Sequence, residues 1–199
     1  MTNRLKSNYK TLKKLSNVYK NLWGNNKKDF CRSLLKIRRK KTSFYGKLLL
    51  SKQSLKLFYS NIKEKSFKRY LYLAVKSPSK TIDKLVSSLE RRLDTVLFRS
   101  LFAFSFFNAR QLINHGSVSI NGITNYSPRK KLYKGDLICL NKAIKSFNLF
   151  RFFVAVRSIP NYIEINFKSF AFVFLWDTNL LNVYYPVNCN YSLIPKLYK

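Results

Sequence analysis

The stretch that decides the fold lies between Arg92 and Leu140 and reads RLDTVLFRSLFAFSFFNARQLINHGSVSINGITNYSPRKKLYKGDLICL. Asp94 and Ser105 can each cap a helix, because short polar side chains accept hydrogen bonds from the first free amides of a helix. Gly116 follows as the left-handed residue that commonly ends a helix. The stretch therefore predicts two short helices, over residues 95 to about 103 and 106 to 114.

The residues after the second helix predict a small antiparallel sheet. Residues 118–120 alternate between apolar and polar side chains, as in a half-buried strand. Asn121-Gly122 favours a two-residue hairpin, since both residues tolerate positive φ. Gly135-Asp136 predicts a second turn, which leads into a strand over residues 137–140.

Helices are predicted before this stretch. Residues 45–75 contain one glycine and no proline, and apolar residues recur at helical spacings, which indicates one or two helices. Pro78 interrupts the pattern, because proline disfavours helix in the residue before it. A further helix is expected over residues 80–90, where Asp83 suits the first turn.

Strands are predicted after this stretch. A basic connection over residues 142–157 leads to an alternating pattern at residues 162–167, which is typical of a strand. Residues 170–176 are apolar and indicate a second strand. Helices followed by short antiparallel strands place the chain in the α+β class.

Positive charge is the strongest feature of the composition. The 199 residues include 39 Lys and Arg but 8 Asp and Glu, for a formal net charge of +31. Residues 1–92 hold 26 of the basic and 4 of the acidic side chains. A body with so much charge of one sign favours a polyanionic partner, either nucleic acid or an anionic membrane surface. No apolar stretch reaches the roughly 18 residues that a transmembrane helix needs.

The sequence offers no catalytic or metal site. Cys31, Cys139 and Cys189 are far apart and form no Cys-x-x-Cys pair, so a zinc site is not expected. His115 is the single histidine, which excludes a dyad of two histidines. The acidic residues are scattered, and no glycine-rich nucleotide loop follows a strand. We expect no catalytic residue, metal or cofactor.

Four blocks resemble, in order and spacing, the S4 RNA-binding domain: Arg92–Arg99, Ala109–Gly116, Val118–Gly122 and Lys134–Asp136. Further segments are similar to the ribosomal protein S4 family: FYG at 44–46, LSKQ at 50–53, LFY at 57–59, KSFKRY at 65–70 and PNYIEI at 160–165. The resemblance covers most of residues 44–199 and is weakest over roughly the last 30.

The resemblance implies a helical N-terminal domain with an inserted S4-type module, in which two helices pack on a small antiparallel sheet. The expected divisions are a basic N-terminal extension (1–43), a helical domain (44–90), the S4 RNA-binding domain (91–145) and a C-terminal segment that returns to the helical domain (146–199). The implied partners are small-subunit ribosomal RNA and neighbouring small-subunit proteins near the messenger entry path.

RNA contacts are expected from basic side chains and from the polar end of the second helix. Basic side chains and helix ends hold phosphates, and such a surface recognises RNA mainly by its shape. The predicted RNA-binding residues are Arg38, Arg39, Lys40, Lys41, Lys52, Lys68, Arg69, Arg91, Arg92, Arg99, Ser105, Arg110, Gln111, Asn114 and His115.

Alternative roles remain open for some of these positions. Asp94 suits a helix cap or an orienting partner for Arg92 better than a direct RNA contact. His115 suits an RNA contact and a structural helix end equally well. Phe106 and Phe107 stand where the family often has a basic residue after the capping Ser, which suggests a partner protein packed on both rings.

Three functions remain to be separated. The first is a structural constituent of the small ribosomal subunit that binds its RNA and supports assembly and translation. The second is a small non-ribosomal S4-domain factor that acts on ribosomes or structured RNA. The third is an enzyme with an appended S4 domain, which the lack of room for a catalytic domain disfavours. Residue types of A/T-rich codons point to an organelle or another A/T-rich genome, and the divergence and composition of the sequence favour a mitochondrial location over a plastid one.

Overall fold

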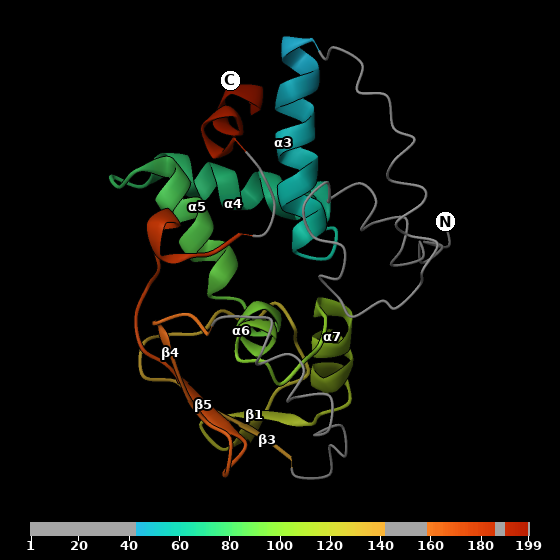
Figure 1. Ribbon diagram of the computed structural model, residues 1–199, viewed down its shortest axis with the longest axis vertical. Helices are drawn as coiled ribbons and strands as arrows, with labels where there is room; N and C mark the ends of the chain where they lie inside the picture. Colours follow the sequence, from blue (N-terminus) through green and yellow to red (C-terminus); the bar gives the residue numbers. More distant parts are fainter. Residues whose placement is uncertain (1–42, 142–158, 186–189, 199) are drawn as a thin grey trace. The chain divides into compact units, whose positions relative to one another are not determined.

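The computed structural model describes residues 43–141, 159–185 and 190–198, and Figure 1 shows their arrangement along the chain. The predicted basic run at residues 38–41 and the connection at 142–157 lie outside the described residues. The chain divides into two compact units. One holds the described residues up to Lys68 with those from Tyr185 onward, and the other holds Arg69–Tyr184.

Two helices follow one another where the sequence predicts one or two. Helix α3 spans Phe44–Phe58 and is capped by Ser43, whose hydroxyl accepts a hydrogen bond from the amide of Gly46 at 3.2 Å. Helix α4 spans Glu64–Lys76. The turn between them passes through Ser60 and Asn61, which both have positive φ. The buried apolar residues of α3, the turn and α4 are Leu48, Leu55, Phe58, Tyr59, Ile62, Phe67, Leu71 and Ala74.

The C-terminal residues pack on α3. Two short 3-10 helices, η3 (Tyr191–Leu193) and η4 (Pro195–Tyr198), contact it. Glu64 accepts hydrogen bonds from the ammonium of Lys52 at 3.2 Å, from Lys56 and from the Tyr198 hydroxyl. One carboxylate therefore joins α3, the first turn of α4 and the C-terminal end.

Glu64 should make this unit sensitive to acid. Burial raises the pKa of its carboxyl, but the hydrogen bonds from Lys56, Tyr198 and Lys52 outweigh burial and lower the pKa from 4.5 to about 2. The stabilisation is therefore complete above pH 4.5 and is lost as the pH falls towards 2. Because the Glu64 side chain is 41% exposed, solvent screening limits it to about 1 kcal/mol.

Thermal unfolding of the wild type and of Glu64→Gln, followed from pH 7 to pH 2, measures this contribution. The two midpoints should differ most above pH 4.5 and converge as Glu64 becomes protonated. A difference that stays constant down to pH 2 would contradict the assignment of Glu64. Glu164→Gln is the matched control, since Glu164 is exposed on a strand.

The described part of the second unit contains three further α-helices and one short 3-10 helix, η2 (Leu180–Asn182). Helix α5 spans Thr81–Glu90, α6 spans Leu93–Arg99 and α7 spans Phe106–Asn114. Ser105 caps α7 as predicted, because its hydroxyl accepts from the amide of Asn108 at 3.2 Å. The prediction that Asp94 caps α6 is wrong. Arg92 is the N-cap residue, and the Asp94 carboxylate in the first turn binds arginines instead.

Helix α6 is also shorter than the predicted range. It ends at Arg99 rather than near residue 103, because Leu101 adopts a left-handed conformation with φ 66°. A non-glycine residue with positive φ cannot continue a right-handed helix. The Leu101 side chain is 3% exposed, so its burial offsets the backbone cost.

The sheet is antiparallel and has the strand order β2-β1-β3-β5-β4. Asn121 and Gly122 form the predicted hairpin turn, with φ of 50° and 83°. The strands are β1 (Val118–Ile120), β2 (Ile123–Thr124), β3 (Leu137–Leu140), β4 (Ile163–Asn166) and β5 (Ala171–Phe174). Figure 1 shows α6 and α7 on one face of this sheet. The α+β class predicted from the sequence is confirmed.

Part of the C-terminal segment belongs to this sheet. Strand β5 pairs with β3 through Leu137 and Val173, and β4 pairs with β5. The segment expected to return to the helical domain is therefore divided: residues 163–166 and 171–174 form strands of the sheet, Leu180–Asn182 contacts α5, and the last residues pack on α3. The predicted divisions at residues 43, 90 and 145 stay predictions.

Aromatic residues fill the space between the helices and the sheet. Phe98 of α6 stacks on Phe106 of α7 with ring centroids 4.1 Å apart, and Phe106 is 0% exposed. Phe102 stacks on Phe172 of β5 at 5.8 Å. Phe106 is thus core and cannot receive a partner protein, whereas Phe107 is half-buried. The suggested docking of a partner on both rings is wrong for Phe106.

Gly116 ends α7 in a conformation that favours glycine. Its φ is 71°, and a Cβ atom added there would lie 2.8 Å from Cε1 of Tyr126. Gly116→Ala should destabilise the chain by about 1–2 kcal/mol, mainly through the left-handed backbone. Urea unfolding measures the loss.

Gly122→Ala is the matched control, because Gly122 has φ 83° but no heavy atom within 4 Å of an added Cβ. The free energy of unfolding that Gly116→Ala loses beyond the loss in Gly122→Ala measures the contact with Tyr126. Equal costs at the two glycines would show that the Tyr126 ring moves aside freely.

Candidate nucleic-acid interface

Polar residues line the C-terminal end of α7. Gln111, Asn114 and His115 are exposed there, as the prediction of RNA contacts requires. Their side chains carry donors and acceptors that suit ribose hydroxyls and bases. Ser105 lies at the other end of the helix, 1% exposed, and its hydroxyl is engaged as the N-cap.

The buried carboxylate of Asp94 binds two of the predicted arginines, Arg92 and Arg110 of α7. Its carboxylate accepts two hydrogen bonds from Arg92, with Nε at 3.0 Å and Nη2 at 2.7 Å, and one from Nε of Arg110 at 2.9 Å. Burial lowers the pKa of Arg92, but Asp94 and Tyr70 outweigh it and raise the pKa above its ordinary value. The Arg92 side chain is 3% exposed, so its guanidinium lies in the interior, bound to the Asp94 carboxylate.

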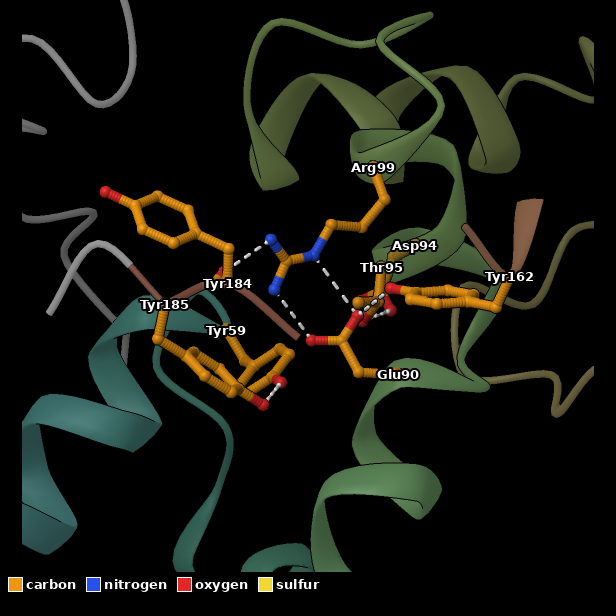
Figure 2. A network of polar contacts seen from close by, with 8 residues as sticks. All are labelled: Tyr59, Glu90, Asp94, Thr95, Arg99, Tyr162, Tyr184 and Tyr185. Carbon is orange, nitrogen blue, oxygen red and sulfur yellow. Dashed lines mark hydrogen bonds and ion pairs between the residues drawn. The ribbon is translucent and has the colours of Figure 1, made fainter. Parts of the chain in front are cut away.

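Glu90 holds Arg99 in a second buried network, which Figure 2 shows. The Glu90 side chain is 0% exposed and accepts from Arg99, with Nη2 at 2.9 Å and Nε at 3.2 Å, and from the Tyr162 hydroxyl at 2.8 Å. The Arg99 guanidinium also donates to the backbone carbonyl of Tyr184 at 2.9 Å. These contacts tie the end of α5 to α6 and to the residue before β4.

The remaining predicted arginines and lysines differ in exposure. Arg91 donates from Nε to the carbonyl of Leu132 at 2.9 Å and pairs with Asp177 at 3.4 Å. Arg69 and Lys68 are exposed on α4. The Lys52 side chain is 14% exposed and pairs with Glu64. The described members of the predicted set thus differ in exposure and in ion-pair partners, and they are divided between the two compact units.

Two lysines outside the predicted set, Lys84 and Lys131, belong to the same compact unit as Arg69 and Arg91. Burial and the positive charges of Arg91, Arg69 and Lys84 lower the pKa of Lys131. Lys84 lies on α5, and Lys131 lies in the loop between β2 and β3. The run of three basic residues at 129–131 was a signal for Lys131, whereas Lys84 gave no sequence signal.

The described residues contain no group of three or more His, Cys, Asp or Glu side chains that could hold a metal ion. Within the same residues, no helix is long and apolar enough to cross a membrane. The side chains of the predicted interface carry basic, hydroxyl, amide and imidazole groups, which suit phosphate and ribose.

Comparison with known proteins agrees with this chemistry over the whole chain. Residues 3–90 match the family described as the ribosomal protein S4/S9 N-terminal domain, and residues 91–138 match the S4 domain. The chain is 35% identical over 209 residues to small ribosomal subunit protein uS4 of Acidiphilium cryptum (strain JF-5), covering 100% of this chain and 99% of the relative.

Another relative shows the same extent of similarity. Small ribosomal subunit protein uS4 of Rhodospirillum centenum (strain ATCC 51521 / SW) is 35% identical over 205 residues, covering 100% of this chain and 99% of that protein. Two adjoining domain matches and similarity from end to end leave one assignment: the chain belongs to the small ribosomal subunit protein uS4 family.

Proposed function

We propose that this protein is a structural constituent of the small ribosomal subunit that binds small-subunit ribosomal RNA and supports subunit assembly and translation. The observation that carries the proposal is the match to proteins of that name over 100% of this chain and 99% of the relative. The net charge of +31 agrees with a permanent RNA partner. Because the family is structural, the chain is not an enzyme.

We propose further that α7 presents the direct RNA contacts. Gln111, Asn114 and His115 are exposed at its end, and Arg110 keeps 28% of its side chain exposed while Asp94 holds it. Arg92 and Arg99 support this surface from their buried ion pairs. The contacts predicted for Arg38, Arg39, Lys40, Lys41, Lys52, Lys68, Arg69, Arg91 and Ser105 remain part of the proposal.

A mitochondrial location and neighbours near the messenger entry path complete the proposal. Abundant Phe and Tyr beside five glycines suggest an A/T-rich genome such as that of an organelle. The relatives named above are bacterial, so the location rests on composition. Recovery of the chain with ribosomes from purified mitochondria would support the location, and recovery from plastids would contradict it.

Gradient sedimentation of a ribosome-containing lysate at low and high salt tests the proposed function. We expect the chain to migrate with small subunits and to stay bound at high salt. Migration as a free protein, or release at modest salt, would contradict the proposal and favour a non-ribosomal S4-domain factor. Detection of the small-subunit RNA in the same fractions provides the internal control.

A further inference from the structure

The sheet of the second unit ends at β4, which has no strand on its far side among the described residues (Figure 1). The opposite edge strand, β2, has 2 residues, whereas β4 has 4, as many as β3 and β5. An edge strand presents unpaired backbone groups with which another chain can pair. None of the five strands contains Lys or Arg, although the net charge of the protein is +31.

The pairing of β4 shows which of its backbone groups face outward. The amide of Leu175 donates to the carbonyl of Tyr162 at 2.9 Å, so every second residue from Tyr162 onward turns its backbone groups towards β5. Ile163 and Ile165 turn theirs the other way. The Ile163 amide donates to the carbonyl of Pro160 at 3.2 Å. The amide and carbonyl of Ile165 and the carbonyl of Ile163 therefore face the edge of the sheet.

A groove of about 680 Å³ lies on the sheet at β4, lined by residues of β3, β4, β5 and the turn after β4. Leu137, Val173 and Glu164 are neighbours across β3, β5 and β4. Their side chains lie on the face opposite the buried Ile138 and Phe172, and Leu137 is 42% exposed. The groove therefore joins an apolar floor to a carboxylate on the edge strand.

The Glu164 carboxylate has no partner among the described residues. Its side chain is exposed and forms none of the ion pairs of the described chain. Lys168 lines the same groove without pairing with it. The other carboxylates of the described residues each accept a hydrogen bond: Glu64, Asp83, Glu90, Asp94, Asp136 and Asp177. Glu164 is thus available to a cation from outside the described chain.

The charge of Glu164 discriminates among the polymers that could cover this groove. It repels RNA phosphates, and no strand residue is basic to offset it. A second copy paired antiparallel at β4 would bring two Glu164 side chains towards each other, and like charges across strands are destabilising. A basic segment of a different protein avoids both conflicts. Its backbone can pair with the edge, and a Lys or Arg side chain can cover apolar surface with its methylene stem while its charged end reaches the carboxylate.

We propose that an extended basic segment of a neighbouring small-subunit protein adds as a strand beside β4. Its backbone hydrogen-bonds to Ile163 and Ile165. A Lys or Arg side chain of the segment pairs with Glu164 and lays its methylene stem over Val173. The proposal rests on the proposed function, because it takes the partner from the small ribosomal subunit.

Photo-crosslinking from the groove identifies the occupant. The full chain carries benzoylphenylalanine in place of Lys168 or, as the control, in place of Ile123 on the opposite edge, and is assembled into small subunits. We expect the Lys168 position to crosslink to one other protein, at a segment in which Lys or Arg alternates with apolar residues. The Ile123 position should not reach that segment. A crosslink from the Lys168 position to RNA, to a second copy or to a segment without basic residues would overturn the proposal, as would no crosslink.

Charge-reversing variants test the role of Glu164. Glu164→Lys should lower the yield of that crosslink about tenfold or more, because like charges repel across an interface. Thr124→Lys is the matched control, since it adds a positive charge to the opposite edge of the same sheet, and it should keep the yield. Joining Glu164→Lys with a glutamate in place of the basic residue that the crosslink identifies should restore the yield. An unchanged yield in Glu164→Lys, or no restoration, would overturn the proposal.

Yields are compared per assembled subunit, so that a variant that fails to fold is not counted as a loss of docking. If Glu164→Lys does not enter subunits, Glu164→Gln takes its place, with an expected loss of about threefold. A yield equal to that of the wild type in Glu164→Gln would then overturn the proposal.

Hydrogen exchange tests the added strand itself. The Ile165 amide faces the edge in the isolated chain and should exchange on the order of tenfold or more slowly in assembled small subunits, where the segment supplies its acceptor. Glu164→Lys should abolish this protection. Equal exchange rates of Ile165 in the isolated chain and in small subunits would overturn the proposal.

Failure of the docking edge differs from failure of the proposed function. A chain that does not migrate with small subunits, but whose Lys168 position crosslinks to a basic segment of another protein in a Glu164-dependent way, refutes the ribosomal role and keeps the edge as a docking site. A chain that migrates with small subunits without that crosslink keeps the role and refutes the docking edge.

Discussion

Replacing Asp94 with Asn is expected to destabilise the protein by about 3–5 kcal/mol, because it leaves buried guanidinium charge without its carboxylate. The Asp94 side chain is 2% exposed and binds Arg92 at 2.7 Å and Arg110 at 2.9 Å. Asn has the same shape but no charge, and its amide group would meet the arginine donors. The loss therefore reports electrostatics rather than a cavity.

Urea unfolding of Asp94→Asn measures this effect, and Glu164→Gln, which neutralises an exposed carboxylate, is the matched control. Arg92→Leu should cost less than Asp94→Asn, since Asp94 still has Arg110 as a partner. A loss below about 1 kcal/mol for Asp94→Asn would show that the arginines find other partners.

Glu90→Gln is the second variant with a large expected effect, again about 3–5 kcal/mol. It removes the charge that faces Arg99, whose side chain is 10% exposed, and it weakens the hydrogen bond from Tyr162. Because Glu90 ends α5 while Arg99 ends α6 and Tyr162 precedes β4, the change should loosen three elements together.

Tyr162→Phe separates the contributions within this network. It deletes only the hydroxyl that donates to Glu90 at 2.8 Å, so it should cost about 1.5–3 kcal/mol, the range for hydrogen bonds to charged groups. Chemical unfolding of both variants gives the comparison. If Glu90→Gln loses less free energy of unfolding than Tyr162→Phe, the ion pair between Glu90 and Arg99 adds little to the stability.

These two networks bear on how RNA-binding variants are interpreted. Arg92 and Arg99 were predicted to bind RNA, yet each is engaged with a buried carboxylate. A loss of RNA affinity on replacing either residue must therefore be compared with the loss of folded protein. Arg110, Gln111, Asn114 and His115 are the better probes of direct contact, since they keep exposed surface on α7.

Local chemistry made much of the second unit predictable. Ser105 caps α7, Gly116 ends it, and Asn121-Gly122 turns the chain between β1 and β2, all as the sequence indicated. Each of these features depends on the conformational preference or hydrogen bond of residues within about four positions of one another. Such short-range rules act in the same way in any fold, so they can be applied without it.

Side-chain partners distant in sequence were not predictable in this way. Asp94 does not cap α6 and binds instead Arg110, which is 16 residues away, and Glu90 accepts a hydrogen bond from Tyr162 across 72 residues. The place of β5 beside β3 and the neighbours of Lys131 likewise depend on segments far apart in the chain.

The sequence by itself determined the α+β class, the ends of α7 and the Asn121-Gly122 turn of the S4 module, the basic character and the family resemblance, because these rest on composition, order and short-range preferences. Only the tertiary structure decided which arginines are engaged by Asp94 and Glu90, and which positive charges lie around Lys131. Buried charges take whichever partner the packed chain brings within reach, since an unpaired one costs several kcal/mol, roughly the stability of a domain.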